Sequence, residues 1–211
     1  MEWTFGIITG GGQEVNINKI IDSIENQNIE NNKYEILIIG NCNIERNNTI
    51  IIPFDENIKP NWITKKKNLI SKLCKFENVV YLHDYVSFEP NWYFNFVNFG
   101  EDWDVCMNCI KNDDGRRFRD WTLWEPIPLN YNDHTQTKNM YVSGTYFYAK
   151  KQFMLKYPLD EKLGWNNCED LVWSFMIRDF WNYKCNAKSI VKCLKHKEDH
   201  TFCTHPTEYK E

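Results

Sequence analysis

At 211 residues the chain has the length of one domain and can bury a sizeable core. Its formal net charge of -4 argues against a general nucleic-acid-binding protein, which would carry a clear basic excess. No apolar run approaches the roughly 18 residues that span a bilayer. The start, Met1-Glu2-Trp3, shows no basic region followed by an apolar stretch, so no signal peptide is predicted.

Aromatic residues make up 16% of the chain and include nine tryptophans, which suits a core together with a binding cleft. The eight cysteines are scattered through apolar runs and do not form a regular framework. We expect Cys74, Cys106 and Cys185 to be buried thiols in a reducing compartment. The sequence therefore predicts a cytoplasmic protein.

The first hundred residues predict alternating strands and helices. Apolar runs predict strands at residues 3–9, 34–39, 49–52 and 79–82. Isoleucines at helical spacing predict a helix over residues 17–24, and Thr64 is expected to cap a second helix, with Leu69, Ile70, Leu73 and Cys74 facing inward. Alternation of this kind is typical of an α/β fold with a doubly wound, mostly parallel sheet and helices on both faces.

The second half is more varied. We expect helices at 92–99, 151–156 and 171–181, and strands at 103–110, 142–149 and 189–194. Asn112-Asp113-Asp114-Gly115 predicts a turn. Residues 116–134 contain three arginines and a proline-containing loop, and are expected to form a flap outside the core; the arginines are Arg116, Arg117 and Arg119.

A polar triplet, His83-Asp84-Tyr85, follows directly on the apolar run Val79-Val80-Tyr81-Leu82. In open α/β sheets, ligands bind just beyond the carboxyl ends of the strands. A carboxylate there can hold a divalent cation against a diphosphate, because hard cations take oxygen ligands. The alternative is an ordinary polar turn at a strand end.

Two further charged segments admit two interpretations each. Lys65-Lys66-Lys67 lies near a helix start, where cations oppose the helix dipole, so it predicts either an anionic partner or a solvated basic face. Glu169-Asp170 opens a helix that is apolar almost all round, with Asn166 or Asn167 as its cap. These two acids are either catalytic or simply favoured by the dipole at a helix start.

The ordered set of these features resembles the GT-A fold glycosyltransferases, most nearly the family-2-like inverting enzymes. The set is a strand with a loop, a Lys-Asn helix, a strand ending in an acidic triplet, a Gly-containing strand, and Trp165 followed by Glu169-Asp170. The resemblance extends over residues 3–196. It implies a single domain, with residues 1–100 binding the nucleotide and residues 101–211 forming the acceptor side and a C-terminal tail.

The resemblance implies that a nucleotide-sugar donor, with UDP as the expected nucleotide, binds at the strand ends with Mn²⁺ or Mg²⁺. His83-Asp84-Tyr85 takes the place of the family's Asp-X-Asp but lacks both outer aspartates. Asp84 is then the anionic metal ligand, and His196 completes the metal site. The remaining donor-binding positions are Thr9, Gly10, Asn41, Asp55, Lys67 and Asn68.

On the acceptor side the resemblance assigns Asp170 as the catalytic base and Glu169 as its neighbour in the acidic pair. Gly144, Trp165, Asp120 and Trp121 are expected to line the acceptor site. The implied reaction is direct displacement at the anomeric carbon by a glycan, protein or small-molecule hydroxyl. Closure of the flap would add an arginine to the stabilisation of the leaving diphosphate.

Three alternatives stay open from the residues. The missing outer aspartates allow a degenerate sugar-nucleotide-binding protein without turnover. A nucleotidyltransferase would share the strand-end carboxylate, but Gly10-Gly11-Gly12 has no basic residue nearby. A zinc site in the tail could use Cys193, His196, His200 and Cys203.

Overall fold

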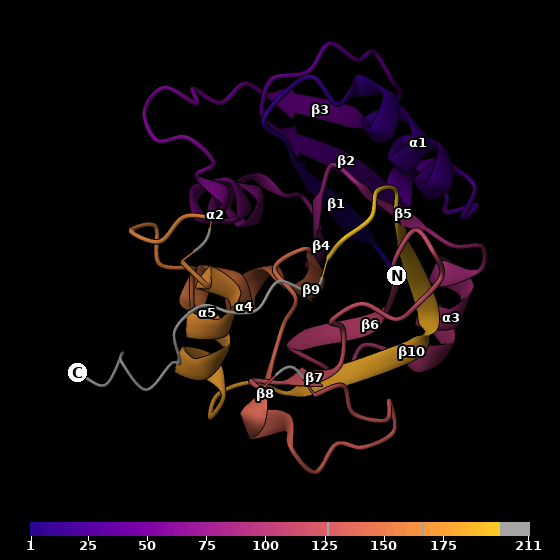
Figure 1. Ribbon diagram of the computed structural model, residues 1–211. Coiled ribbons are helices and arrows are strands. Elements are labelled where there is room, and N and C mark those ends of the chain that lie inside the picture. Colours follow the sequence, from indigo (N-terminus) through magenta and orange to yellow (C-terminus); the bar gives the residue numbers. More distant parts are fainter. Residues whose placement is uncertain (126, 166, 199–211) are drawn as a thin grey trace.

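The computed structural model describes residues 1–125, 127–165 and 167–198 and shows an α/β fold built on one mixed sheet (Figure 1). The eight-stranded sheet has the order β3-β2-β1-β4-β9-β6-β10-β5. The predicted fold class is confirmed. Two short strands, β7 (Thr122–Leu123) and β8 (Met140–Tyr141), pair separately as a second small sheet.

Four parallel strands form the N-terminal half of the sheet: β1 (Trp3–Ile8), β2 (Tyr34–Ile39), β3 (Thr49–Ile52) and β4 (Asn78–His83). These strands lie within about one residue of their predicted bounds. One detail of the expected alternation is wrong, because β2 and β3 are joined by residues 40–48 without a helix.

The C-terminal half makes the sheet mixed. Strand β9 (Tyr146–Lys150) runs antiparallel between β4 and β6 (Val105–Lys111). Strand β10 (Tyr183–Cys193) pairs in parallel with β6 and in an antiparallel sense with β5 (Val86–Phe88). β10 begins six residues earlier than the predicted strand, and β9 begins four residues later.

Helices cover both faces of the sheet. Figure 1 shows α1 (Glu14–Glu25) and α3 (Trp92–Phe99) on one side, and α2 (Ile63–Leu73), α4 (Lys151–Lys156) and α5 (Glu169–Ile177) on the other. Side chains alternate along a strand, so neighbouring β1 residues meet different layers. Trp3 and Phe5 pack on Trp92 of α3, whereas Gly6 lies under Ile70 of α2. Two 3₁₀ turns, Asn31–Lys33 and Thr137–Asn139, complete the elements.

The expected helix starts are wrong in two places. Helix α2 begins one residue before Thr64, whose hydroxyl instead donates to the Leu163 carbonyl oxygen at 2.7 Å. The residue before helix α5 is Cys168, whose backbone is in the left-handed region. Asn167 does not cap the helix, because its side chain accepts a hydrogen bond from the Gly164 amide. The predicted cap Asn166 lies outside the described residues.

The predicted inward faces of two helices also need correction. Leu73 of α2 is 49% exposed, and the buried positions of that helix include Lys66, Lys67 and Asn68 instead. The solvated basic face is therefore wrong for these two lysines. Helix α5 is buried along one face only, since Met176 is 57% exposed.

The expectation of a flap is wrong for residues 118–123, which pack into the core. Asp120 and Trp121 are fully buried. The Asp120 carboxylate accepts hydrogen bonds from the Ile110 amide and the Tyr131 hydroxyl and pairs with Arg117. Both residues are thus part of the core, and neither lines the two cavities described below.

The burial expected for the three cysteines named above is confirmed. Cys74, Cys106 and Cys185 are buried free thiols, and burial raises the pKa of each. Cys168 differs, because it takes part in a disulfide. Among the described residues, no helix combines the length and apolar character needed to cross a bilayer.

Candidate active site

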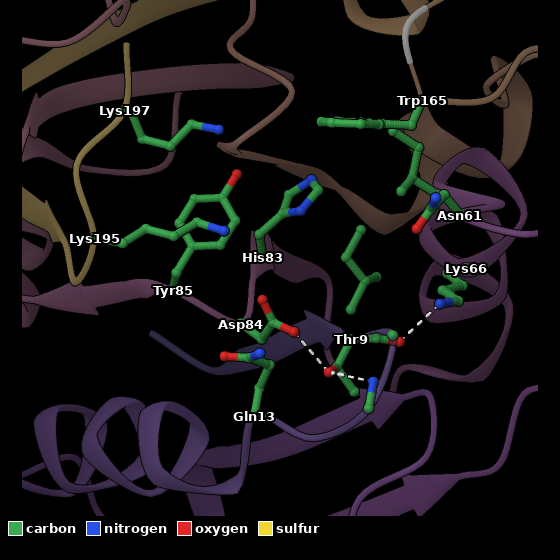
Figure 2. A pocket seen from close by; sticks show the side chains of 14 residues that line it. Thr9, Gln13, Asn61, Lys66, His83, Asp84, Tyr85, Trp165, Lys195 and Lys197 are labelled. Carbon is green, nitrogen blue, oxygen red and sulfur yellow. Dashed lines mark hydrogen bonds between the residues drawn. The ribbon is translucent and has the colours of Figure 1, made fainter.

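A cavity of about 270 Å³ opens at the carboxyl ends of β1 and β4 (Figure 2). The two strands are parallel and in register, with Ile8 opposite His83, so the residues that follow each strand meet at one edge. Its lining side chains come from five separate parts of the chain. They are Thr9 and Gln13, Asn61 and Lys66, His83, Asp84 and Tyr85, and Trp165, Lys195 and Lys197.

Thr9 organises the floor of this cavity. Its hydroxyl donates to the Asp84 carboxylate at 2.6 Å and accepts from the Gly11 amide at 3.1 Å. Its carbonyl oxygen accepts a hydrogen bond from the buried Lys66 ammonium at 2.7 Å, and that ammonium also pairs with Glu56. Lys66 therefore ties the loop after β1 to helix α2.

A second cavity, of about 530 Å³, adjoins the first and contains the acidic pair. Gly144, Glu169 and Asp170 line it. The two cavities share the lining residues Ile63, His83, Tyr85, Trp165 and Lys197. A ligand lying across these shared residues contacts the strand-end triplet and approaches the carboxylates of α5.

Gly144 allows the acidic pair to come close to the backbone before β9. The Gly144 amide donates to the Asp170 carboxylate at 2.8 Å. A Cβ atom at this position would lie 2.8 Å from a Glu169 oxygen and 2.9 Å from an Asp170 oxygen. A residue without a side chain is thus required for this arrangement.

Glu169 and Lys67 form a buried pair behind Asp170. The Lys67 ammonium lies 3.3 Å from the Glu169 carboxylate and donates to the Gly144 carbonyl oxygen at 2.8 Å. Burial and the neighbouring Asp170 raise the pKa of Glu169 to about 7, and Lys67 opposes the rise. Asp170 is the more exposed of the two acids and accepts hydrogen bonds from the Gly144 and Leu171 amides. Asp170 is therefore the better placed to meet a ligand.

Two lysines after β10 enter the first cavity. Lys195 and Lys197 stand over the Tyr85 ring, with their nitrogens 4.1 and 5.1 Å from its centroid. Figure 2 shows both ammonium groups on the same side of the cavity as His83 and Tyr85. His196, between them, turns away and bonds the Asp113 carboxylate at 2.7 Å.

The strand-end triplet lies in a positive environment. Burial, Lys67, Lys197, Lys195 and Lys66 all lower the pKa of His83, which is therefore neutral at physiological pH. Burial raises the pKa of Asp84, and the Thr9 hydrogen bond, Lys195 and Lys66 oppose the rise. This side of the site favours an anionic ligand.

Several predicted donor positions do not reach the cavity. Asn41 is exposed and hydrogen-bonds the backbone of Phe54. Asp55 is also exposed, and its carboxylate accepts from Asn57. Asn68 is buried against residues 159–161, and Lys67 pairs with Glu169. The structure brings together Thr9, Gly10, His83, Asp84 and Tyr85.

The arginines of the expected flap also separate. Arg116 pairs with Asp114, and Arg117 pairs with the buried Asp120. Arg119 lines the second cavity. Trp165, which is 57% exposed, lines both cavities.

A divalent cation, implied by the resemblance, does not fit the donor set near Asp84. Among the described residues lining the first cavity, Asp84 is the single carboxylate, and one of its oxygens is occupied by Thr9. Three lysines line the same cavity. The one group of three possible ligands found in the described residues is Asp113, Asp114 and His196, and none of these lines either cavity. The donor set around Asp84 therefore suits an anion better than a divalent cation.

The alternative zinc site falls partly outside the described residues, which exclude His200 and Cys203. Of its other two members, Cys193 is fully buried in β10 and His196 is exposed beside Asp113. Cys193 is not part of the group of possible ligands around His196.

No protein-family model and no curated protein matches this sequence. Solved structures do resemble it. The structure of S. aureus TarS 1–349 in complex with UDP-GlcNAc has a TM-score of 0.67 and 14% identity, over 99% of this chain and 63% of that one. GalNAc-T7 with UDP, GalNAc and Mn²⁺ has a TM-score of 0.71 and 13% identity, over 94% of this chain and 44% of that one.

This chain has the GT-A fold. Both neighbours are glycosyltransferases. The strand order reverses direction between β1 and β4, and the first cavity lies beyond the carboxyl ends of these two strands, where open α/β sheets bind their ligands. The chain spans less than two thirds of the length of either neighbour.

Four polar side chains of the first cavity are not predicted as site residues from the sequence: Gln13, Asn61, Lys195 and Lys197. The sequence indicates Lys66 only as part of a basic run. For the two tail lysines a signal existed, because residues at i and i+2 in an extended segment share a side, and they flank His196. The position predicted for His196 in the cavity is therefore occupied by its two neighbours in sequence, Lys195 and Lys197.

Proposed function

We propose that this protein transfers a sugar from a nucleotide-sugar donor to an acceptor hydroxyl. The observation that carries the proposal is the junction of the two cavities at His83, Tyr85 and Trp165. One cavity has the position and charge for a nucleotide diphosphate, and the other presents a carboxylate to an incoming hydroxyl. The nucleotide-binding half of the proposed domain is residues 1–100, although Trp165 and two tail lysines add to its cavity.

The donor that fits the proposal is a UDP-sugar. The TarS and GalNAc-T7 structures hold UDP-GlcNAc and UDP respectively, in a fold shared with this chain. Trp165 offers an exposed aromatic face at the junction, where a sugar ring would stack. The acceptor is the hydroxyl of a glycan, a protein or a small molecule.

The proposed chemistry is a single displacement with inversion at the anomeric carbon. Asp170 removes the acceptor proton while the new bond from oxygen to the anomeric carbon forms and the bond to the diphosphate oxygen breaks. The Gly144 amide and the start of α5 hold the Asp170 carboxylate in place. Glu169, neutralised in part by Lys67, stands behind it.

Two other functions compete with transfer. A degenerate protein would bind the nucleotide sugar without turnover. A nucleotidyltransferase would release pyrophosphate from a nucleoside triphosphate. The retained Asp170, aimed into the second cavity, favours transfer over both.

The test is a panel of nucleoside diphosphates and nucleotide sugars, read first by melting temperature and then by release of the nucleoside diphosphate. A ligand at a hundredfold excess over its dissociation constant stabilises the folded state by about 2.7 kcal/mol. We expect UDP and a UDP-sugar to raise the melting temperature and the UDP-sugar to be consumed. A protein that binds UDP-sugars but never turns one over, with any acceptor, is the degenerate form. Stabilisation by none of the diphosphates would reject the proposal.

A further inference from the structure

We infer that Lys195 and Lys197 hold the diphosphate of the donor and stabilise its charge as it leaves, in the place where the fold implies a divalent cation. This inference rests on the proposed function but goes beyond it, because a sugar transferase with this fold could still use a metal ion to hold the diphosphate.

The pairing of β5 with β10 fixes the position of the two lysines. Cys193 lies opposite Val86 in this antiparallel pair, and the Leu194 amide donates to the Tyr85 carbonyl oxygen at 2.7 Å. Lys195 follows directly, at the end of the pair where the chain leaves β10 beside the turn at Asp84 and Tyr85. The lysine therefore reaches the strand-end triplet because β10 pairs with β5, and Figure 2 shows its ammonium group against the Tyr85 ring.

The charges in the cavity favour an anion. Neither Lys195 nor Lys197 forms an ion pair with a carboxylate among the residues that the structure describes, whereas Lys66 is paired with Glu56. Lys197 is half-buried, and both burial and Lys195 lower its pKa, so the two ammonium groups repel each other. A diphosphate lying between them would relieve that repulsion, and a cation would add to it.

The lysines act on the leaving group and exchange no proton. As the acceptor oxygen attacks, the electron pair of the bond between the anomeric carbon and the bridging oxygen passes to the diphosphate. The extra negative charge is met by two ammonium groups already in place, which is electrostatic stabilisation by fixed charges. The acceptor proton goes to Asp170, so charge and atoms balance without a metal ion.

Binding measurements with UDP and uridine test the inference, because the two ligands differ only in the diphosphate. Titrations in EDTA and again in Mn²⁺ compare the wild type with Lys195→Met, Lys197→Met and the double variant. We expect the wild type to prefer UDP equally in both solutions. Each single variant should lose about tenfold of that preference, since a hydrogen bond to a charged group contributes about 1.5–3 kcal/mol. Uridine affinity should not change.

Two controls share the same segment of the chain. Lys188→Met removes an exposed lysine from β10 that lines neither cavity. His196→Gln removes the side chain between the two lysines. Both should keep the full preference for UDP. Lys195 is exposed, so its variant should melt at the wild-type temperature.

The outcomes separate the two proposals. Binding of UDP that vanishes in EDTA, or a double variant that retains the preference, would overturn the lysine clamp and leave transfer standing. A wild-type protein that binds UDP in neither solution would reject the UDP-sugar function itself.

Discussion

The two adjoining cavities differ in their balance of charge along one sheet edge. Among the described residues that line the first, Asp84 is the single carboxylate beside three lysines. The second contains the paired carboxylates of Glu169 and Asp170, with Lys67 buried behind them, and its wall also carries Glu198, Arg119 and the shared Lys197. The contrast shows how a mixed sheet can receive an anionic leaving group on one side and keep a proton acceptor on the other.

The cavities also differ in how their groups are held. Asp84 takes its place through the register of β1 and β4 and a hydrogen bond from Thr9. The acidic pair depends on a close approach between Gly144 and the start of α5. Changes in the second cavity should therefore affect the chemistry, whereas changes in the first should affect donor binding.

Asp170→Asn should produce the largest effect and the cleanest separation of the two cavities. Loss of one general base commonly costs ~10²–10⁴ in rate. Donor affinity should stay within about twofold, since Asp170 lines the second cavity and not the first. Steady-state turnover and UDP titration measure the two effects, and melting temperature shows whether the start of α5 is disturbed.

Glu169→Gln is the matched control for the base. If this variant is inactive and Asp170→Asn is active, Glu169 is the base. Full activity in both variants would reduce the pair to an ordinary helix start and reject the mechanism.

Gly144→Ala should have the next largest effect, again on turnover. The added Cβ would lie within 3 Å of an oxygen on each acid, so the carboxylates must move. A shift of about 1 Å in a reacting group costs up to about 10² in rate. Gly164→Ala is the control, because its nearest neighbour is 3.5 Å from the added carbon. Equal activity of the two variants would show that the close approach has no role in turnover.

The sequence predicts the first half of the fold better than the site. Strands β1, β2 and β4 are short apolar runs whose burial follows from local pattern alone, whereas β3 at the sheet edge stays partly exposed. Lys67 and Asn68 resist prediction because their partners lie about a hundred residues away, at 159–169. Asp120 is equally hard to predict, because a charged residue in a polar loop is buried only where donors satisfy it, and here four residues donate to its carboxylate.

Residue identity alone also gives the wrong position for His196, which the sequence predicts in the metal site. A histidine after the last strand resembles a metal ligand, but the pairing of β10 with β5 turns Lys195 and Lys197 toward the cavity instead. Asp84, Glu169 and Asp170 do line the cavities, and each lies at the end of a strand or the start of a helix. Such positions can be inferred before the fold is known.

A smaller effect is expected on stability as a function of pH. Between its ordinary pKa of 4.5 and about 7, Glu169 keeps its proton in the folded state while the unfolded chain has released it. The folded state then binds more protons, so stability falls as pH rises through this window, by on the order of 1–3 kcal/mol. Urea denaturation of wild type and Glu169→Gln at pH 5 and pH 8 measures the difference. We expect the free energy of unfolding of the variant to fall less between pH 5 and pH 8 than that of the wild type. Part of the fall that remains in the variant is due to Asp84, because burial raises the pKa of that carboxyl as well.

Trp165→Ala should have the smallest effect and should affect both cavities. Trp165 lines each of them and is 57% exposed, so its removal disturbs little of the core. Stacking of a base on an aromatic side chain contributes about 1–3 kcal/mol to binding. We expect the contribution of Trp165 to lie at the lower end of this range, because its ring is exposed to solvent. We expect KM for the donor to rise about three- to tenfold, kcat to stay within about twofold, and the melting temperature to hold. Phe180→Ala is the matched control, because Phe180 is 61% exposed and lines neither cavity. A fall in kcat comparable to that of Asp170→Asn would contradict a binding role and make Trp165 part of the positioning of the reacting groups.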